Sequence, residues 1–438
     1  MSVADTAKLA PQLGLEEVLK ALVPSNYTLD TMITAFPGYL TNLSDYLSTA
    51  PKDTIQTFLY WKAIQNVASY IEADELKPLK AFNNILSGRE PDATSERYKI
   101  CISHVDNGLG WILSRFYVEA AFSAQAKTLG DQIISDIREQ FIARIKTLAW
   151  MDGQTKKVAI DKATNIIQKI GYPTASPNMT DPEDLLNYYA GLDISDVYFN
   201  NSLNMDKLAV NKSWSQLGKP YDRNTWFMTA DTVNAYYNPP GNEIVFPAAI
   251  MQFPVFGAGF PGYVNYGAFG SVAGHELSHA FDNNGRHYDA DGKYTDWWTN
   301  HTVEEFTKRA DCFVEEYNNF TVIGTNGTIH VHGAQTLGEN IADAGGLTAS
   351  FNAWNARRQD YPDSDLPGLD YFTQEQLFYI AYGNFWCAKY TKAALTRGVL
   401  LDPHSPNMWR LQGAAMMNAR GFKEAFNCPS KEPTCELW

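Results

Sequence analysis

The sequence has no long apolar run, no excess of basic charge and no closely paired cysteines. No run reaches the about 20 apolar residues of a membrane-spanning helix, so we expect no transmembrane segment. A formal net charge of −14 disfavours nucleic acid and anionic membrane surfaces as partners. None of the five cysteines forms a CxxC pair, which argues against a cysteine-ligated zinc site. The opening MSVADTAKLAPQLG lacks the basic and apolar regions of a signal peptide, so we expect none there.

The composition is that of a globular protein with more than one domain. The chain has 438 residues, enough for two or three domains and a large core. Hydrophobic residues make up 45% of it and charged residues 19%, which excludes a disordered chain.

Sequons and cysteines both indicate the secretory pathway. Eight Asn-x-Ser/Thr sequons together favour a glycosylated, secreted or extracellular protein. An odd number of cysteines in an oxidising compartment requires at least one partner outside the chain, whereas an intracellular protein with buried free thiols is the alternative. The predicted glycosylation sites are Asn26, Asn42, Asn178, Asn200, Asn211, Asn300, Asn319 and Asn326.

The pattern of apolar residues divides the chain near residues 170–175. From about residue 15 to 170, apolar residues recur at three- and four-residue steps, which predicts helices almost throughout. Residues 172–233 are rich in Asn, Pro, Ser and Tyr and predict loops with short helices. Residues 234–256 place β-type residues around a Pro-Pro-Gly turn, which indicates a hairpin edge. Further helices are expected from Thr336 onwards and over residues 374–396.

The motif GHELSHAFDNN contains an HExxH at His275, Glu276 and His279. Positions i and i+4 of a helix share one face, so two imidazoles can bind one cation. The glutamate beside the first histidine can reach a water on that metal and accept its proton. The motif therefore predicts a metal centre with a general base.

A catalytic zinc site needs a third protein ligand. A metzincin would have a histidine six residues after His279, but that position is Gly285, so this class is excluded. Among the candidates we choose Glu339, because GENIADAGG predicts a helix with Asp343 four residues later on the same face. The other candidates are His287, His301, His330 and His332.

Each motif alone has an ordinary structural explanation. An HExxH can occur by chance on an exposed helix, and a Glu-x-x-x-Asp is usually a solvated helix face. Here both segments are flanked by glycines and small apolar residues, as in closely packed helices. That combination favours a functional site.

Four segments resemble the neprilysin-like zinc metallopeptidases, which include the endothelin-converting enzymes. They are VNAYYNPPGNEIVFPAAI, GHELSHAFDNNGRHYDADGKYTDWW, TLGENIADAGG and the terminal CELW. From roughly residue 15 to the end, the chain is similar to the C-terminal two-thirds of that family. The family's N-terminal region is expected to be absent.

The resemblance implies a mainly α fold with a small β-sheet. It implies a helical lid domain, of which residues 1–171 are the remainder, and a thermolysin-like zincin catalytic domain at residues 172–438. One Zn²⁺ would be bound by His275, His279 and Glu339, with Glu276 as the base. Asp343 would orient a zinc-bound histidine, and His404 would stabilise the oxyanion.

The resemblance also implies the substrate-binding groups. Asn234 and Ala235 match the segment that holds the peptide backbone, and Arg410 matches an arginine that binds a substrate carbonyl. An apolar pocket for the residue after the scissile bond implies cleavage on the amino side of large hydrophobic residues. Its expected lining is Ile250, Val255 or Phe256, Val272, Phe385 and Trp386, and Ser271 stands where a larger residue is expected.

By the same resemblance, Cys312 pairs with Cys435 inside the chain. Cys101, Cys387 and Cys428 would bond to cysteines of a separate N-terminal fragment of the same enzyme. The function expected is a zinc endopeptidase for peptides and flexible segments. Two alternatives are a catalytically silent, peptide-binding subunit and a fragment that is inert without its N-terminal part.

Overall fold

The computed structural model describes residues 1–34 and 36–438 and divides them into two compact units. The first unit comprises residues 1–82, 91–109 and 183–222, and the second comprises residues 83–90, 110–182 and 223–438. One of the passages of the chain between them lies within a long helix, α6 (Arg97–Ala121), whose backbone leaves helical geometry at Leu109.

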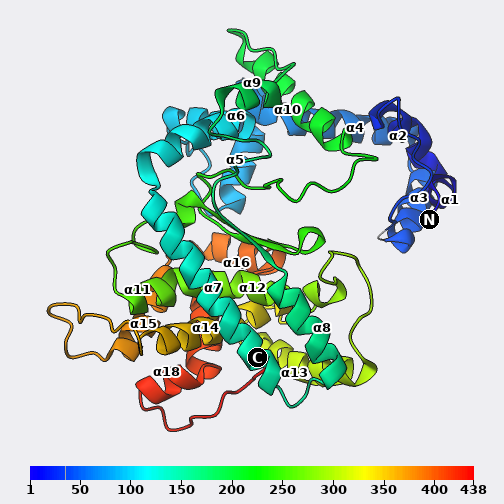
Figure 1. Ribbon diagram of the computed structural model, residues 1–438. Coiled ribbons are helices and arrows are strands. Elements are labelled where there is room, and N and C mark those ends of the chain that lie inside the picture. The colour runs from blue at the N-terminus through cyan, green and yellow to red at the C-terminus, as the bar shows by residue number, and fades with distance from the viewer. Residues whose placement is uncertain (35) are drawn as a thin grey trace. The chain divides into compact units, whose positions relative to one another are not determined.

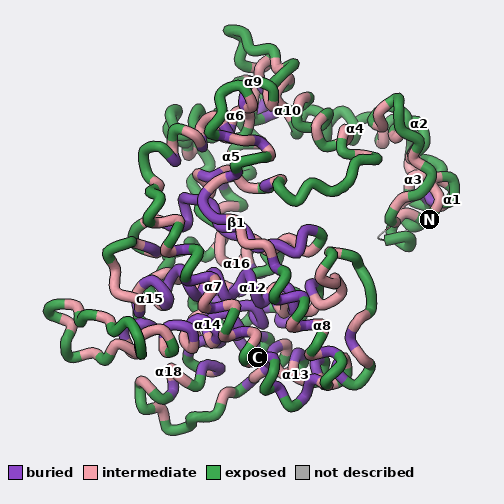
Figure 2. Tube along the Cα trace, in the orientation of Figure 1, coloured by how far each residue is buried: buried purple, intermediate pink, exposed green. Residues whose placement is uncertain are grey.

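The first unit is built of helices joined by loops (Figure 1). Its short helices bury few side chains, and most of its trace is exposed (Figure 2). Helices α5 (Lys77–Leu86) and α6 each begin here and continue into the second unit. The other helices are α1 (Val3–Leu9), α2 (Leu15–Leu22), α3 (Pro37–Thr49), α4 (Lys52–Val67), α9 (Pro182–Tyr188) and α10 (Tyr198–Trp214).

The second unit combines helices with a three-stranded sheet in the order β1-β3-β2. The strands are β1 (Ile167–Gly171), β2 (Tyr236–Asn238) and β3 (Glu243–Pro247). Strand β1 pairs parallel to β3, and β2 pairs antiparallel to β3 around the Pro239–Gly241 turn. The helices are α7 (Ala124–Thr147), α8 (Gly153–Thr164), α11 (Gly262–Asn265), α12 (Ser271–His279), α13 (Asn300–Asn318), α14 (Leu337–Arg357), α15 (Gln374–Phe385), α16 (Lys392–Leu401), α17 (Asn407–Arg410) and α18 (Arg420–Ala425).

The core of the second unit lies between α7, α12 and α14, where Figure 2 shows most of the buried trace. Helix α7 contributes an apolar stripe at four-residue steps, Ile133, Ile137, Phe141 and Ile145, each no more than 1% exposed. Residues four apart lie on one helix face, so this stripe packs as a single ridge. The core thus positions α12 and α14, the two helices on which the sequence places the metal ligands.

Helices α12 and α14 cross at two glycines, Gly274 and Gly346. A Cβ atom built on Gly274 would lie 2.4 Å from the carbonyl oxygen of Gly346. One built on Gly346 would lie 2.2 Å from the backbone nitrogen of His275. These neighbours are backbone atoms, so no rotation of a side chain could relieve the clash. Close approach of the two helices therefore requires glycine at both positions.

The C-terminal segment is part of the core. A disulfide joins Cys312 on α13 to Cys435, across a sequence separation of 123, and it is the pair that the resemblance implies. The indole of Trp150 donates a hydrogen bond of 3.0 Å to the carbonyl of Leu437. The ring of Trp438 packs against Phe141. The disulfide and these contacts fix the end of the chain beside α7.

The structure confirms the expected fold class, a mainly α protein with a small sheet. The prediction of loops and short helices over residues 172–233 missed α10, which has 17 residues. The block expected at residues 374–396 is divided into α15 and the beginning of α16. The boundary near residues 170–175 stays a prediction. Within the described residues, no helix is long and apolar enough to cross a membrane.

Replacing Gly346 tests the helix crossing. We expect Gly346→Ala to destabilise the second unit by about 1–3 kcal/mol or more, because its methyl group meets the backbone of α12. The control is Gly398→Ala in α16, where an added Cβ meets nothing within 4 Å. The control should be neutral or stabilising by up to about 1 kcal/mol. Denaturant unfolding midpoints measure both, and equal stability of the two variants would contradict the crossing geometry.

Candidate metal centre

Three side chains from the two crossing helices converge on one point. His275 and His279 lie on α12 with their Nε2 atoms 3.0 Å apart. Glu339, in the first turn of α14, places its Oε2 atom 3.2 Å from Nε2 of His275 and 3.4 Å from Nε2 of His279. In the part of the chain that the structure describes, these residues form the one group of three or more His, Cys, Asp or Glu whose ligand atoms all lie within 4.8 Å of one another. The structure therefore brings together the predicted metal ligands.

A carboxylate fixes each histidine from behind. Nδ1 of His275 lies 2.9 Å from Oδ1 of Asp343, and Nδ1 of His279 lies 2.7 Å from Oδ2 of Asp282. When Nδ1 donates its proton to a carboxylate, Nε2 keeps a lone pair for a metal. Carboxylates in this position set the tautomer and the orientation of metal-binding imidazoles.

The three side chains fit a zinc ion. Oε2 of Glu339 is buried and has no hydrogen-bond partner among the described residues, although imidazole nitrogens lie close to it. If Nδ1 of each ring donates to its carboxylate, the two Nε2 atoms face each other with lone pairs. A cation between them would satisfy all three atoms, and two imidazoles with one carboxylate are a donor set of catalytic zinc sites.

The carboxyl groups of the site differ in their pKa values. Burial raises the pKa of Glu276. The pKa of Glu339 lies well below its usual range. Burial acts to raise it, but the three neighbouring imidazoles outweigh burial. Burial acts to raise the pKa of Asp343, but Arg410 and His275 together lower it to about 2. These opposite directions suit a carboxylate ligand at Glu339 and a proton acceptor at Glu276.

Arg410 and His404 complete the polar wall. Arg410 donates from Nε and Nη2 to the two oxygens of Asp343, at 2.7 and 2.6 Å, and its guanidinium lies 3.9 Å from the ring centre of Trp386. Nδ1 of His404 lies 2.7 Å from Oδ1 of Asp402, and its Nε2 lies 3.2 Å from Oε2 of Glu339. His404 therefore lies beside the predicted ligand Glu339, and Arg410 bonds to Asp343, the carboxylate behind His275.

A cavity of about 650 Å³ opens onto these residues. The structure does not place Phe256 on its wall: this side chain is 2% exposed and packs against Phe269 in the core. The predicted substrate-binding residues that line the cavity are Asn234, Ala235, Ile250, Val272, Phe385, Trp386 and Arg410, and Ser271 lies beside them.

Two carboxylates of the site were missed in the sequence. Asp282 lies three residues after His279, beyond the end of α12, and Asp402 lies two residues before His404. Each spacing was a weak signal, because only the turn geometry makes the aspartate reach the ring. The other candidate ligands, His287, His301, His330 and His332, lie outside the cluster that the described residues form.

The predicted glycosylation sites and free cysteines lie mostly at the surface. Seven of the eight sequon asparagines are exposed, and Asn178 is half-buried. Cys101 and Cys387 are exposed, and Cys428 is half-buried. Occupancy of the sequons and pairing of these cysteines stay predictions.

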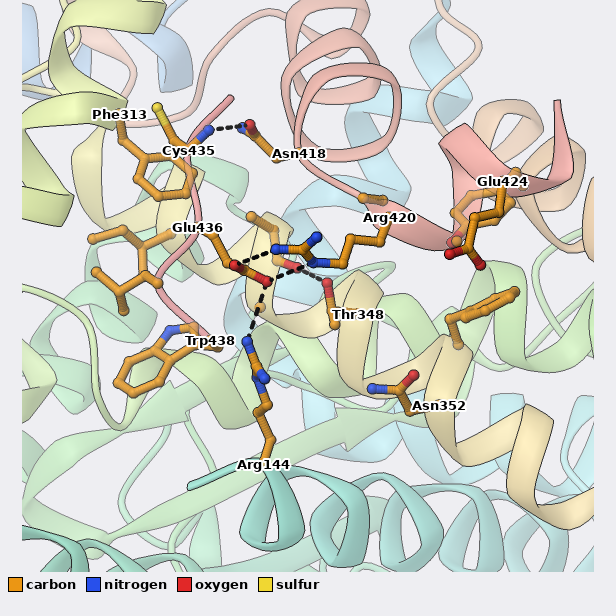
Figure 3. A pocket seen from close by; sticks show the side chains of 18 of the residues that line it. Arg144, Phe313, Thr348, Asn352, Asn418, Arg420, Glu424, Cys435, Glu436 and Trp438 are labelled. Atoms are coloured by element: carbon orange, nitrogen blue, oxygen red, sulfur yellow. Dashed lines mark hydrogen bonds and ion pairs between the residues drawn. The ribbon is translucent and has the colours of Figure 1, made fainter. Parts of the chain in front are cut away.

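A second cavity, of about 320 Å³, lies against another face of α14. Figure 3 shows Arg144 and Arg420 both directed at Glu436, with Thr348 and Asn352 of α14 beside them. It shares no lining residue with the metal cavity. This cavity forms where the C-terminal segment packs and is separate from the metal centre.

An HExxH helix, with a carboxylate from a neighbouring helix, defines a thermolysin-like zincin. Comparison with known proteins is more specific: two sequence models of peptidase family M13 match residues 234–436 and, for the N-terminal part of the family, residues 1–173. The chain belongs to peptidase family M13. It therefore includes a portion of the family's N-terminal part.

Its relatives are considerably longer. An endothelin-converting enzyme homolog from Locusta migratoria is 38% identical over 92% of this chain and 55% of its own length. Human endothelin-converting enzyme 1 is 36% identical over 91% of this chain and 52% of its own length. Neprilysin-3 from Drosophila melanogaster is 35% identical over the whole chain and 56% of its own length. The chain thus spans about half the length of the relatives it matches.

Solved structures agree with this assignment. The zinc metalloprotease Zmp1 of Mycobacterium tuberculosis, in complex with an inhibitor, has a TM-score of 0.86 at 29% identity. The match covers all of this chain and 64% of that one. PepO from Lactobacillus rhamnosis HN001 has a TM-score of 0.79 at 26% identity, over all of this chain and 65% of that one.

Proposed function

We propose that the protein is a zinc-dependent endopeptidase that cleaves peptides and flexible segments. The observation that carries the proposal is the convergence of His275, His279 and Glu339 at a cavity that also contains Glu276. Membership of peptidase family M13 supports it. Both histidines are fixed from behind by carboxylates, which a solvated helix face would not require.

Zinc at these three ligands would polarise a substrate carbonyl and lower the pKa of water toward about 7. Glu276 takes a proton from the water while the oxygen of that water bonds to the scissile carbonyl carbon. Glu339 raises the pKa of His404, so its ring can carry a proton on Nε2 in addition to the one that Nδ1 donates to Asp402. This Nε2 donates a hydrogen bond to the oxygen that becomes negative, and one well-placed donor typically stabilises the transition state by about 3 kcal/mol. Glu276 then gives its proton to the leaving amine as the C–N bond breaks.

The cavity wall supports a preference for peptides with large apolar residues. Asn234 and Ala235 line the cavity and lead into β2, an outer strand of the sheet, so we propose that an extended substrate lies along this segment. One part of the wall is apolar. We propose that it holds the residue after the scissile bond, with cleavage on the amino side, and that the small Ser271 leaves room there. The apolar lining is Ile250, Val272, Phe385 and Trp386.

Replacing the base separates catalysis from metal binding. We expect Glu276→Gln to keep zinc and to lose about 10²–10⁴-fold in turnover, because the amide cannot accept the proton. Zinc analysis and cleavage of a quenched peptide, with and without chelator and a phosphoramidon-type inhibitor, measure both properties. Exposed Glu304→Gln serves as the control.

Substantial turnover in Glu276→Gln would overturn the assignment of the base. Zinc binding without turnover in the wild-type chain would instead favour the silent peptide-binding subunit or the inert fragment.

We further propose that the chain pairs with an N-terminal fragment of the same enzyme through disulfides. In the first unit, α4 has no buried residue, and Phe58, Leu59, Tyr60 and Trp61 are 43–64% exposed. Contiguous apolar exposure of this kind marks an interaction surface. The relatives' greater length supplies a candidate occupant, and Cys101 and Cys387 are accessible for bonding. The exposed sequons support a secreted or extracellular setting.

Electrophoresis of the protein from its natural source tests this pairing. Without reductant we expect a mass above 49.0 kDa, and reduction should release a second chain. The bond between Cys312 and Cys435 cannot produce this drop, because both residues belong to one chain. An unchanged mass on reduction, with three thiols that alkylate freely beforehand, would exclude the linkage through Cys101, Cys387 and Cys428.

A further inference from the structure

Lys162, on α8, is a lysine buried completely in the second unit, at 0% exposure. Its Nζ atom donates to three carbonyl oxygens, those of Ala280 at 2.6 Å, Gly285 at 2.8 Å and Tyr288 at 2.7 Å. Three acceptors match the three N–H bonds of an ammonium group. The side chain is therefore fully hydrogen-bonded without contact to solvent.

All three acceptors belong to the segment that follows the HExxH helix. Ala280 caps the C-terminal end of α12, where unpaired carbonyls and the helix dipole favour a positive charge. Asp282 and Asp289 add negative charge near the ammonium, although burial outweighs them and lowers the pKa of Lys162 to about 7. Lys162 thus holds residues 280–288 in place from α8.

One glycine connects Lys162 to the metal ligand His279. The carbonyl of Gly285 accepts from Lys162, and the N–H of the same Gly285 donates to Oδ1 of Asp282 at 2.7 Å. The other oxygen of Asp282 lies 2.7 Å from Nδ1 of His279. A Cβ on Gly285 would lie 1.8 Å from the carbonyl oxygen of His279, so the turn fits only glycine. A shift of Gly285 would therefore move the carboxylate that orients the imidazole.

Lys162 also adjoins the strand proposed to hold substrate. Its backbone carbonyl accepts from Asn242 at 3.2 Å, and the hydroxyl of Tyr237 on β2 donates to the same Asn242 at 3.2 Å. Burial raises the pKa of Tyr237, so this hydroxyl keeps its proton. The residue thus connects the metal-side turn with the cavity wall.

We propose that Lys162 is a positioning residue of the metal centre, which holds Gly285 so that Asp282 keeps His279 directed at the metal. The proposal rests on the zinc site described under the proposed function. It is distinct from a purely structural role, in which loss of the ammonium would lower the stability of the fold and leave the metal affinity unchanged.

Lys169 on β1 provides a matched control. Its ammonium is also buried, with the side chain 10% exposed, and it bonds to Glu243 at 2.7 Å and to the carbonyl of Thr225 at 2.9 Å. Those partners lie outside residues 280–288. Lys169→Met therefore removes a buried, paired ammonium without touching the turn that carries Asp282.

The experiment measures metal binding by the whole chain. Zn²⁺ affinity is determined by competition with a chromogenic chelator, and the visible spectrum of the Co²⁺-loaded protein reports ligand geometry. We expect Lys162→Met to weaken Zn²⁺ binding about 10–100-fold, the range found when partners behind metal ligands are removed, and to change the Co²⁺ spectrum. Lys169→Met should lower stability and leave affinity and spectrum as in the wild type.

A double-mutant cycle identifies the route of the effect. If Lys162 acts through Asp282, then Lys162→Met should cost little further affinity in an Asp282→Asn background, because the contact it supports is already lost. Additive effects of the two substitutions would overturn the proposed route. If Lys169→Met lost as much Zn²⁺ affinity as Lys162→Met, the role of Lys162 would be structural only and the proposal would be wrong.

Should Lys162→Met fail to fold, Lys162→Gln decides the question, because its amide retains two donors for the three carbonyls. It should fold and bind Zn²⁺ several-fold more weakly, and unchanged affinity would overturn the proposal. Failure of the proposed function looks different: a wild-type chain that binds no Zn²⁺ would reject the metal centre, and this inference with it.

Discussion

The structure of the site depends on the approach of two helix backbones at Gly274 and Gly346. His275 and His279 come from α12, and Glu339 comes from α14, so the proposed ligands come together only where these helices touch. With any larger residue at the crossing, the carboxylate would recede from both imidazoles. The apolar stripe of α7 supports the pair from the core. Close packing of the two helices therefore brings the carboxylate of Glu339 to the two imidazoles, and it also contributes to the stability of the fold.

Charge compensation is the second requirement, because several ionised groups are buried side by side. Asp343 balances Arg410 and His275 at once, and Arg410 also lies over the ring of Trp386. A buried charge is tolerated only when it is paired and hydrogen-bonded. Lys162 meets the same requirement with carbonyl groups in place of a carboxylate. The site is thus fixed by polar contacts from behind, and its other face is directed at the cavity where we propose that metal and substrate bind.

The sequence revealed what depends on local spacing and missed what depends on turns and packing. The HExxH and the helix of Glu339 and Asp343 could be predicted, since helical spacing alone puts their side chains on one face. The family resemblance supplied His404, Arg410 and the disulfide of Cys312. Asp282 was missed because it reaches His279 through a turn beyond the helix. Phe256, expected at the cavity, packs inward on Phe269, and Lys162 has no local pattern that distinguishes it from exposed lysines.

The most direct test of this account is X-ray absorption of the Zn²⁺-loaded chain. It predicts about four light-atom neighbours, with two imidazole nitrogens at about 2.0–2.1 Å and a carboxylate oxygen at about 2.0–2.2 Å. In a Glu339→Gln variant the two imidazoles should remain while the affinity falls. A third imidazole, or a sulfur neighbour at about 2.3 Å, would contradict the assignment of Glu339 as the third ligand.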